Sequence, residues 1–378
     1  MYKHIIRPLA FLVPPETMHR MLLWLLRGIG WIPGGRWLLE QCMAVRHPAL
    51  EREVFGCRFA NPVGLAAGFD SSGEVCRELG ALGFGFVEVG TVTPRPQAGN
   101  AKPRLFRLPE DRALIGRIGQ SRGLEKTIQH LRKSHAGLIV GCNIGHNAGA
   151  SYEAIPAEYL KVFRNLYQYA DYFTVNLCCD GAAGVETTHS REQLLRVLNP
   201  LFDFRRGQND YRPVMLKISP DLTDEQIDCV TDILIETPLD GIVAANGTFS
   251  RAGLKTSAEE VAEIGAGRLS GAPQTMRTIE IVRRIHERSG GGYPIIGVGG
   301  LMSVDDVRAM LDAGADLVQL YTGYLYEGPR LVRDICRGLI ADAAAQPASA
   351  PESTSASAAE PEPPAASEQE AQPQPPTE

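Results

Sequence analysis

The stretch DYFTVNLCCDGAAG, from Asp171 to Gly184, joins an apolar segment to a polar, glycine-containing one. Residues 172–177 are rich in aromatic and β-branched side chains, which predicts a buried strand. The residues that follow, 178–184, are small or polar and contain glycine, which suits a loop that lies close against a ligand. Asn176 and Cys179 are therefore the first candidates for chemistry at the end of a strand.

The same pattern, a short apolar run followed by a segment of helical period, recurs from residue 59 onward. Strands that alternate with helices at this spacing are typical of parallel βα units, and eight of them close most simply into a (β/α)8 barrel. In such a barrel the active site lies at the carboxyl ends of the strands. We therefore predict an α/β barrel with its chemistry at that end. The expected strands span 62–67, 86–89, 138–143, 172–176, 214–218, 241–246, 294–298 and 317–321, and the expected helices include 74–82, 124–133, 224–236, 277–287, 304–311 and 331–341.

The composition limits the kinds of partner that the chain is expected to bind. The chain has 378 residues and a formal net charge of -6, but residues 345–378 hold six Glu and no Asp, Lys or Arg, so the remainder is neutral. Without a basic excess, nothing indicates a nucleic-acid partner. The eight cysteines form no CxxC pair and no Cys/His cluster at zinc spacing, which predicts reduced thiols and no metal site.

The composition also divides the chain into three regions. Residues 46–342 are expected to form the barrel, and 343–378, rich in Ala, Pro, Ser, Glu and Gln without periodicity, a disordered tail. The apolar runs of residues 1–45 are interrupted by Arg, Gly and Pro before they reach the roughly 20 residues that a spanning helix needs. Three Trp interleaved with Arg favour short amphipathic helices in a bilayer interface, at the cytoplasmic face of a membrane. A helical cap packed on the barrel is the alternative.

Two glycine-containing turns follow the last two expected strands. GVGG spans 297–300 and YTG spans 321–323. Backbone amides at these strand ends are where barrels commonly bind a phosphate group. A Gly-rich segment alone is often only a tight turn, but the two segments together favour a phosphate-bearing ligand.

Lys217 stands inside an otherwise apolar strand, VMLKISPDL. A buried Lys is rarely left without a partner. Lys217 could pair with Glu88 inside the barrel, or it could place a cation beside a flavin ring or another anionic cofactor. His146 and His189 are expected in surface loops, where they support no catalytic triad or metal site.

Several long segments resemble the quinone-linked (class 2) dihydroorotate dehydrogenases, over roughly residues 1–342. They include NPVGLAAGFD (61–70), LKISPDLTDEQ (216–226), PIIGVGG (294–300) and GADLVQLYTG (314–323). The resemblance implies an FMN-containing barrel at the membrane. Such an enzyme oxidises dihydroorotate and passes the electrons through the flavin to a quinone in pyrimidine synthesis. The amphipathic N-terminus is similar to the family's membrane-facing extension, where the quinone enters.

The residues that match the family's FMN contacts are retained. They are Ala67, Gly68, Thr91, Asn143, Asn176, Lys217, Gly271, Gly299, Gly300, Tyr321 and Thr322.

The positions that match the family's substrate contacts are largely changed. Ser71 stands where the family has a Lys, and Gly116 and Gly181 stand where it has Asn. Each lost hydrogen bond in a buried pocket costs about 1 to 3 kcal/mol, which predicts altered or weakened binding of dihydroorotate. Arg268, which replaces a Gly, could offset part of this loss. The full set of expected substrate contacts is Ser71, Gly116, Gln120 (for Phe), Asn176, Gly181, Asn246 and Gly247 (for Thr), while Ala245 replaces a Thr beside the flavin.

The catalytic base is expected in the loop after the fourth strand. By the resemblance, Cys179 takes the place of the family's catalytic Ser, and the soluble class 1 relatives use a Cys there. Asp180 follows directly, and its negative charge would oppose formation of a thiolate. Either Cys179 or Asp180 can therefore serve as the base.

Three functions compete on this sequence. The first is an FMN-dependent oxidoreductase that acts on dihydroorotate or, given the altered pocket, on another small molecule. The second is a non-catalytic flavin-binding paralogue that acts as a partner or regulator. The third is a phosphate-binding barrel without flavin, which a yellow purified protein would exclude.

Overall fold

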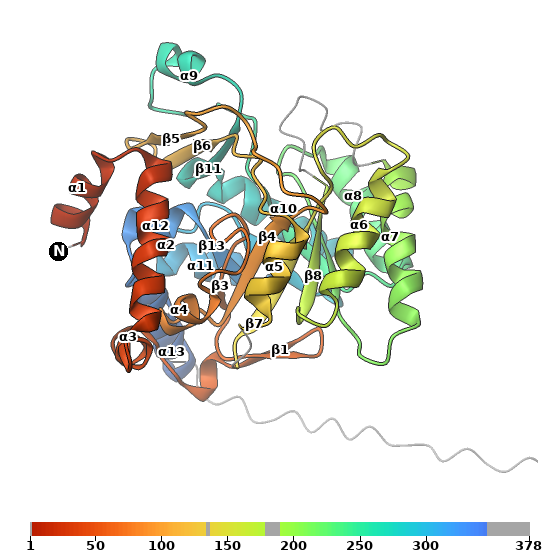
Figure 1. Cartoon of the computed structure of the whole chain (residues 1–378), viewed down its shortest axis with the longest axis horizontal. Helices are drawn as coiled ribbons and strands as arrows, with labels where there is room; N and C mark the ends of the chain where they lie inside the picture. Colours follow the sequence, from red (N-terminus) through yellow and green to blue (C-terminus); the bar gives the residue numbers. More distant parts are fainter. Residues whose placement is uncertain (1, 134–136, 178–189, 346–378) are drawn as a thin grey trace, which may run out of the picture.

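Eight parallel strands form a closed barrel at the centre of the molecule (Figure 1). The computed structural model describes residues 2–133, 137–177 and 190–345. All eight barrel strands fall within the predicted segments or within three residues of their ends, so the prediction of an α/β barrel is confirmed. In their order around the barrel the strands are β10 (Gly241–Ala244), β12 (Ile295–Val298), β13 (Leu317–Leu320), β3 (Val63–Leu65), β4 (Phe86–Val92), β7 (Ile139–Ile144), β8 (Tyr172–Asn176) and β9 (Val214–Lys217).

Helices surround the barrel, and local sequence sets their ends. The helix α8 (Asp224–Glu236) begins at a capping box in which Thr223 and Gln226 each bind the other's backbone amide, at 3.3 and 2.9 Å. Ion pairs join α8 to α10 (Thr275–Arg288), for example between Arg284 and Asp228 at 2.7 Å. The other helices that cover the barrel are α4 (Cys76–Ala81), α5 (Leu124–Leu131), α6 (Ile155–Leu166), α7 (Arg191–Arg206), α11 (Val304–Asp312) and α13 (Leu331–Ala345).

Smaller elements close the two ends of the barrel. A hairpin of β1 (Arg52–Val54) and β2 (Cys57–Phe59) lies at the amino ends of the strands, where the buried Phe59 ring packs 5.1 Å from that of Phe86. An antiparallel sheet of β5 (Leu105–Leu108), β6 (Ala113–Gly116) and β11 (Arg268–Gly271) lies over the opposite end (Figure 1). The remaining elements of this end are α9 (Ala258–Ile264), η3 (Ala272–Gln274) and α12 (Thr322–Glu327).

The N-terminal helices pack along one side of the barrel. They are η1 (Tyr2–Ile6), α1 (Arg7–Phe11), α2 (Pro15–Trp31) and α3 (Gly35–Met43). Leu26 of α2 is buried, while Trp24 and Trp31 are each 75% exposed and Trp37 of α3 is 63% exposed. The segment thus combines a face packed on the barrel with an outward aromatic face. No helix within the described ranges is long and apolar enough to cross a bilayer. The predicted tail, residues 346–378, lies outside the described residues.

Candidate active site

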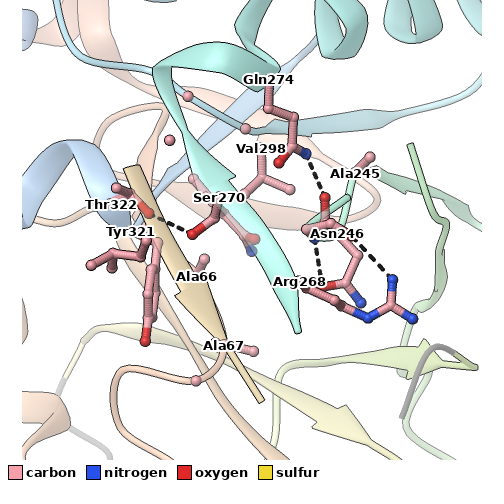
Figure 2. A pocket seen from close by; sticks show the side chains of 18 of the residues that line it. Ala66, Ala67, Ala245, Asn246, Arg268, Ser270, Gln274, Val298, Tyr321 and Thr322 are labelled. Carbon is pink, nitrogen blue, oxygen red and sulfur yellow. Dashed lines mark hydrogen bonds between the residues drawn. The ribbon is translucent and has the colours of Figure 1, made fainter. Parts of the chain in front are cut away.

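A cavity of about 210 Å³ lies at the carboxyl ends of the barrel strands, beneath β6 and β11 (Figure 2). In Figure 2, Tyr321, Thr322 and Ser270 lie on one side of it and Asn246 and Arg268 on the other. Eight of the residues expected to contact FMN line this cavity: Ala67, Gly68, Lys217, Gly271, Gly299, Gly300, Tyr321 and Thr322.

Backbone amides gather at one end of the cavity. Gly300 has a φ of 70°, and a Cβ there would lie 2.6 Å from the carbonyl oxygen of Gly271, so only glycine fits. Among the described residues, the N–H groups of Gly300, Thr322 and Gly323 donate to no acceptor. The hydroxyl groups of Thr322 and Ser270 lie 2.8 Å apart beside them. This set of donors suits the oxygens of a phosphate group.

Lys217 brings a positive charge into the same cavity. Its side chain is buried, with 5% exposed, and it forms no hydrogen bond or ion pair within the described part of the chain. The alternative partner, Glu88, instead accepts hydrogen bonds from Asn143 and Gln319, both at 2.8 Å. Because Lys217 has no carboxylate partner among the described residues, its ammonium group suits an electron-rich or anionic ligand.

Two buried glutamines supply acceptors that the sequence analysis missed. Gln274 and Gln319 are 3% and 1% exposed, and the Oε1 atom of each has no hydrogen-bond partner among the described residues. Both side chains line the cavity. Gln319 could have been found by the signal that identified Lys217, since it is a polar residue inside the apolar strand LVQL. The cation, the amide donors and these acceptors together fit the phosphate and the polar ring edge of FMN.

A network of side chains from several strands lies next to this cavity. Thr91 donates to Asn143 Oδ1 at 2.7 Å, and Asn176 Nδ2 lies 3.1 Å from Thr91 Oγ1. Asn246 in turn donates to Asn176 Oδ1 at 3.3 Å. Asn143 is fully buried and lines neither this cavity nor the next, so within the protein it orients Thr91 and Asn176.

A second cavity, of about 320 Å³, adjoins the first. Gln120 lines it, but its Oε1 accepts a 2.6 Å hydrogen bond from the buried Arg104. Gly247 lines the first cavity instead. Cys179, Asp180 and Gly181 lie outside the described residues. The other expected substrate contacts all line the second cavity: Ser71, Gly116, Asn176 and Asn246.

The expectation that His146 lies in a surface loop is wrong. His146 is only 4% exposed and lines the second cavity. Its Nδ1 lies 3.0 Å from the carbonyl oxygen of Asn147, and its ring centroid lies 5.8 Å from that of Tyr159. The loop after β7 folds inward because α6 carries Tyr159 against the end of the barrel, which the local sequence does not reveal. His189 lies outside the described residues.

A third cavity, of about 420 Å³, lies between the N-terminal helices and the β5–β6 sheet. Its lining is mainly apolar and includes Phe11, Leu22 and Leu25. His19 lines both the second and the third cavities, and burial lowers the pKa of its ring below the ordinary value. Leu105 and Tyr321 line all three cavities, so the three spaces meet at these two side chains.

Comparisons with known proteins agree on one family. The family model described as dihydroorotate dehydrogenase matches residues 49–342. A dihydroorotate dehydrogenase (quinone) from Christiangramia forsetii is 45% identical, with 89% of this chain and 97% of that protein covered. The protein of the same name from Thermosynechococcus vestitus is 42% identical, with coverage of 90% and 97%. The crystal structure of a dihydroorotate dehydrogenase from Eimeria tenella in complex with ferulenol is 30% identical with a TM-score of 0.78, covering 87% of this chain and 92% of that one.

These similarities confirm the prediction of an oxidoreductase of the dihydroorotate dehydrogenase type, from a family that generally uses FMN. The residues matched by the family model include the barrel strands, the sheet over their carboxyl ends and the whole lining of the first cavity. The N-terminal helices, which supply most of the lining of the third cavity, lie before residue 49. The chain belongs to the quinone-linked dihydroorotate dehydrogenase family.

Proposed function

We propose that this chain oxidises dihydroorotate to orotate in pyrimidine synthesis, with FMN in the first cavity and a quinone as electron acceptor. The observation that carries this proposal is the meeting of three cavities with different linings at Leu105 and Tyr321. FMN, when bound, would accept a hydride from the substrate and pass the electrons on. A polar site for the substrate and an apolar site for the acceptor then both adjoin the cofactor site.

The residues have distinct roles in this proposal. Lys217 and the amides near Gly300 hold the cofactor, and the network through Thr91 fixes the side chains of Asn176 and Asn246. These two amide groups line the second cavity, where they can bind the ring amides of the substrate. Cys179 or Asp180 takes the substrate proton as the hydride leaves.

The third cavity supports a quinone acceptor and a membrane surface. Residues of α2 form part of its apolar lining, including Trp24, and both Trp24 and Trp31 of this helix are largely exposed. Aromatic side chains on a short amphipathic helix favour the bilayer interface, where quinones dissolve. We propose that the protein binds the cytoplasmic face of a membrane through residues 1–45, with 46–342 as the catalytic unit.

The substrate contacts support a further, finer proposal. Ser71 and Gly116 leave the second cavity without two of the groups that the family's pattern places there, and Gln120 is held by Arg104. We therefore propose that dihydroorotate binds less tightly than it does to relatives that keep those groups. The same departures favour the second candidate function, a non-catalytic flavin-binding paralogue.

Steady-state turnover separates these two functions. The purified protein, supplied with dihydroorotate and a short-chain quinone, should form one orotate for each quinone reduced, and should give little product with NAD or fumarate as acceptor. A yellow protein that forms no orotate with any of the acceptors would favour the non-catalytic paralogue. A protein that stays colourless after reconstitution with excess FMN would exclude both.

A further inference from the structure

Arg268 of β11 lies beside two glycines from other parts of the chain, Gly116 of β6 and Gly247 of the loop after β10. It pairs with Gly116 across the β6–β11 ladder, and its Nη1 donates to the carbonyl oxygen of Gly247 at 3.0 Å. A Cβ on Gly247 would lie 2.9 Å from the Cβ of Arg268. A side chain at position 247 and the arginine at 268 therefore exclude each other. Gly116 is the ladder partner of Arg268 and presents no side chain beside it, but a Cβ at 116 would meet only Leu105 Cδ1, at 3.4 Å, so the steric exclusion concerns position 247 alone.

Within the described part of the chain, two contacts position the guanidinium group. One is the hydrogen bond to Gly247, which Figure 2 shows beside Asn246. The other is the ring of Phe249, whose centroid lies 4.3 Å from the guanidinium carbon. A planar guanidinium that is stacked on a ring and bonded to a carbonyl is preorganised for binding a carboxylate. The side chain lines both the first and the second cavities, so it lies where cofactor and substrate would meet.

Other positive groups of the second cavity have different tasks. Arg117 donates to the carbonyl oxygens of Ile264 and Ala266 at 2.6 and 3.0 Å, which ties β6 to the end of α9. Arg122 forms an ion pair with Glu74 at 3.3 Å. Arg20 is exposed on α2 and Ser71 is neutral, so neither provides a fixed charge near the cofactor cavity.

We propose that Arg268 is the residue that binds the anionic group of the substrate, and that position 247 is a glycine because this makes room for Arg268. The carboxylate is then held from the β11 side of the cavity and not from the loop after β3. This inference rests on the proposed function, because dihydroorotate and orotate are the carboxylates that the site would meet.

Calorimetric titration of the oxidised holoenzyme tests the proposal. The ligands are orotate and uracil, a neutral ring without the carboxylate. The proteins are the wild type, Arg268→Gln, Arg268→Lys and the control Arg283→Gln, on the exposed face of α10. Loss of a charge-assisted, two-point contact should weaken orotate binding by roughly 10- to 150-fold in Arg268→Gln and by less in Arg268→Lys. Uracil affinity should stay within about twofold in all variants, and Arg283→Gln should match the wild type.

Two results would overturn the proposal. Unchanged orotate affinity in Arg268→Gln would show that the anion is bound elsewhere. An equal loss of orotate and uracil affinity, or release of the flavin from the variant, would show that Arg268 only supports the structure of the site.

The outcomes also separate this inference from the proposed function. If dihydroorotate fails to reduce the wild type but Arg268→Gln selectively loses orotate, the function is wrong and the role of Arg268 stands. If the wild type oxidises dihydroorotate and Arg268→Gln binds orotate normally, the proposed function stands and the proposed role of Arg268 is wrong.

Discussion

Lys217 keeps a positive charge in a buried strand without an ion pair in the described part of the chain. Replacing it by Met should weaken FMN binding by roughly 10- to 150-fold, because one charge-assisted contact is lost. The apoprotein should be as stable as the wild type or more stable, since an uncompensated buried charge is costly. Fluorescence titration of FMN and thermal unfolding of the apoprotein measure the two effects. The control is Lys161→Met on the exposed side of α6, and equal FMN affinity in the two variants would contradict the role of Lys217.

The substrate contacts allow a restoration experiment. Ser71→Lys, Gly116→Asn and Gly181→Asn together should raise kcat/KM for dihydroorotate by roughly 10- to 100-fold, because they return groups worth about 1 to 3 kcal/mol each to a desolvated site. Cys179→Ser alone should change it little if Asp180 is the base. Efficient oxidation of dihydroorotate by the wild type, with no gain in the triple variant, would show that the substrate side is not impaired.

At the level of single residues, the sequence shows which polar residues interrupt apolar strands, but not which residues they contact in the folded protein. Lys217 is recognisable because a charge interrupts an apolar run. The pairing of Gly247 with Arg268 is not, because it joins the end of β10 to a strand that lies across the barrel mouth. Gln274 is hidden for the same reason: its Nε2 donates to Asn246, 28 residues earlier in the chain.

The helix α2 is held on the barrel by a small number of polar contacts. The ring Nε2 of His19 lies 2.7 Å from the carbonyl oxygen of Phe69, and Glu16 binds the buried Arg104 at 2.9 Å. Burial lowers the pKa of His19, while the hydrogen bond to Phe69 and the charges of Asp70 and Glu16 oppose that shift. The packed helix therefore favours the neutral ring.

This packing should depend on pH. With a lowered pKa in the packed state, His19 contributes stability that is present above its ordinary pKa of about 6.5 and is lost as the pH falls through the lowered value. Hydrogen exchange in α2 should therefore speed up, relative to the barrel strands, between about pH 7.5 and about pH 5.5 after correction for intrinsic rates. His19→Gln keeps a donor but does not titrate, so it should abolish this change. The same pH response in both proteins would assign it to other groups.

At the level of elements, the periodicity of the sequence is sufficient to predict the barrel strands but not the sheet that lies over the barrel. The strands of the barrel alternate with helices along the chain, so each βα unit is visible locally. The sheet of β5, β6 and β11 joins Gly116 to Arg268, far apart in the sequence, through strands of four residues. Such a pairing depends on tertiary structure, and it is this sheet that brings Arg268 to the site.

For the whole molecule, the outward aromatic face of the N-terminal helices predicts membrane binding. Trp24, Trp31 and Trp37 are all more than half exposed. The full-length protein should sediment with vesicles that contain anionic lipid, and deletion of residues 1–40 should leave the barrel in the supernatant. Replacing the three Trp by Ser should reduce sedimentation while leaving the contacts of Leu26 and His19 in place. Full-length protein that stays in the supernatant with lipid present would identify the segment as a packed cap only.

We propose that the three adjoining cavities form one path for electrons from dihydroorotate, through FMN, to a quinone. Anaerobic stopped-flow spectroscopy of the purified holoenzyme tests it most directly. Dihydroorotate alone should bleach the flavin absorbance within one turnover, and a later addition of quinone should restore it. Flavin that stays oxidised with saturating dihydroorotate, in a protein that still binds orotate, would contradict the claim.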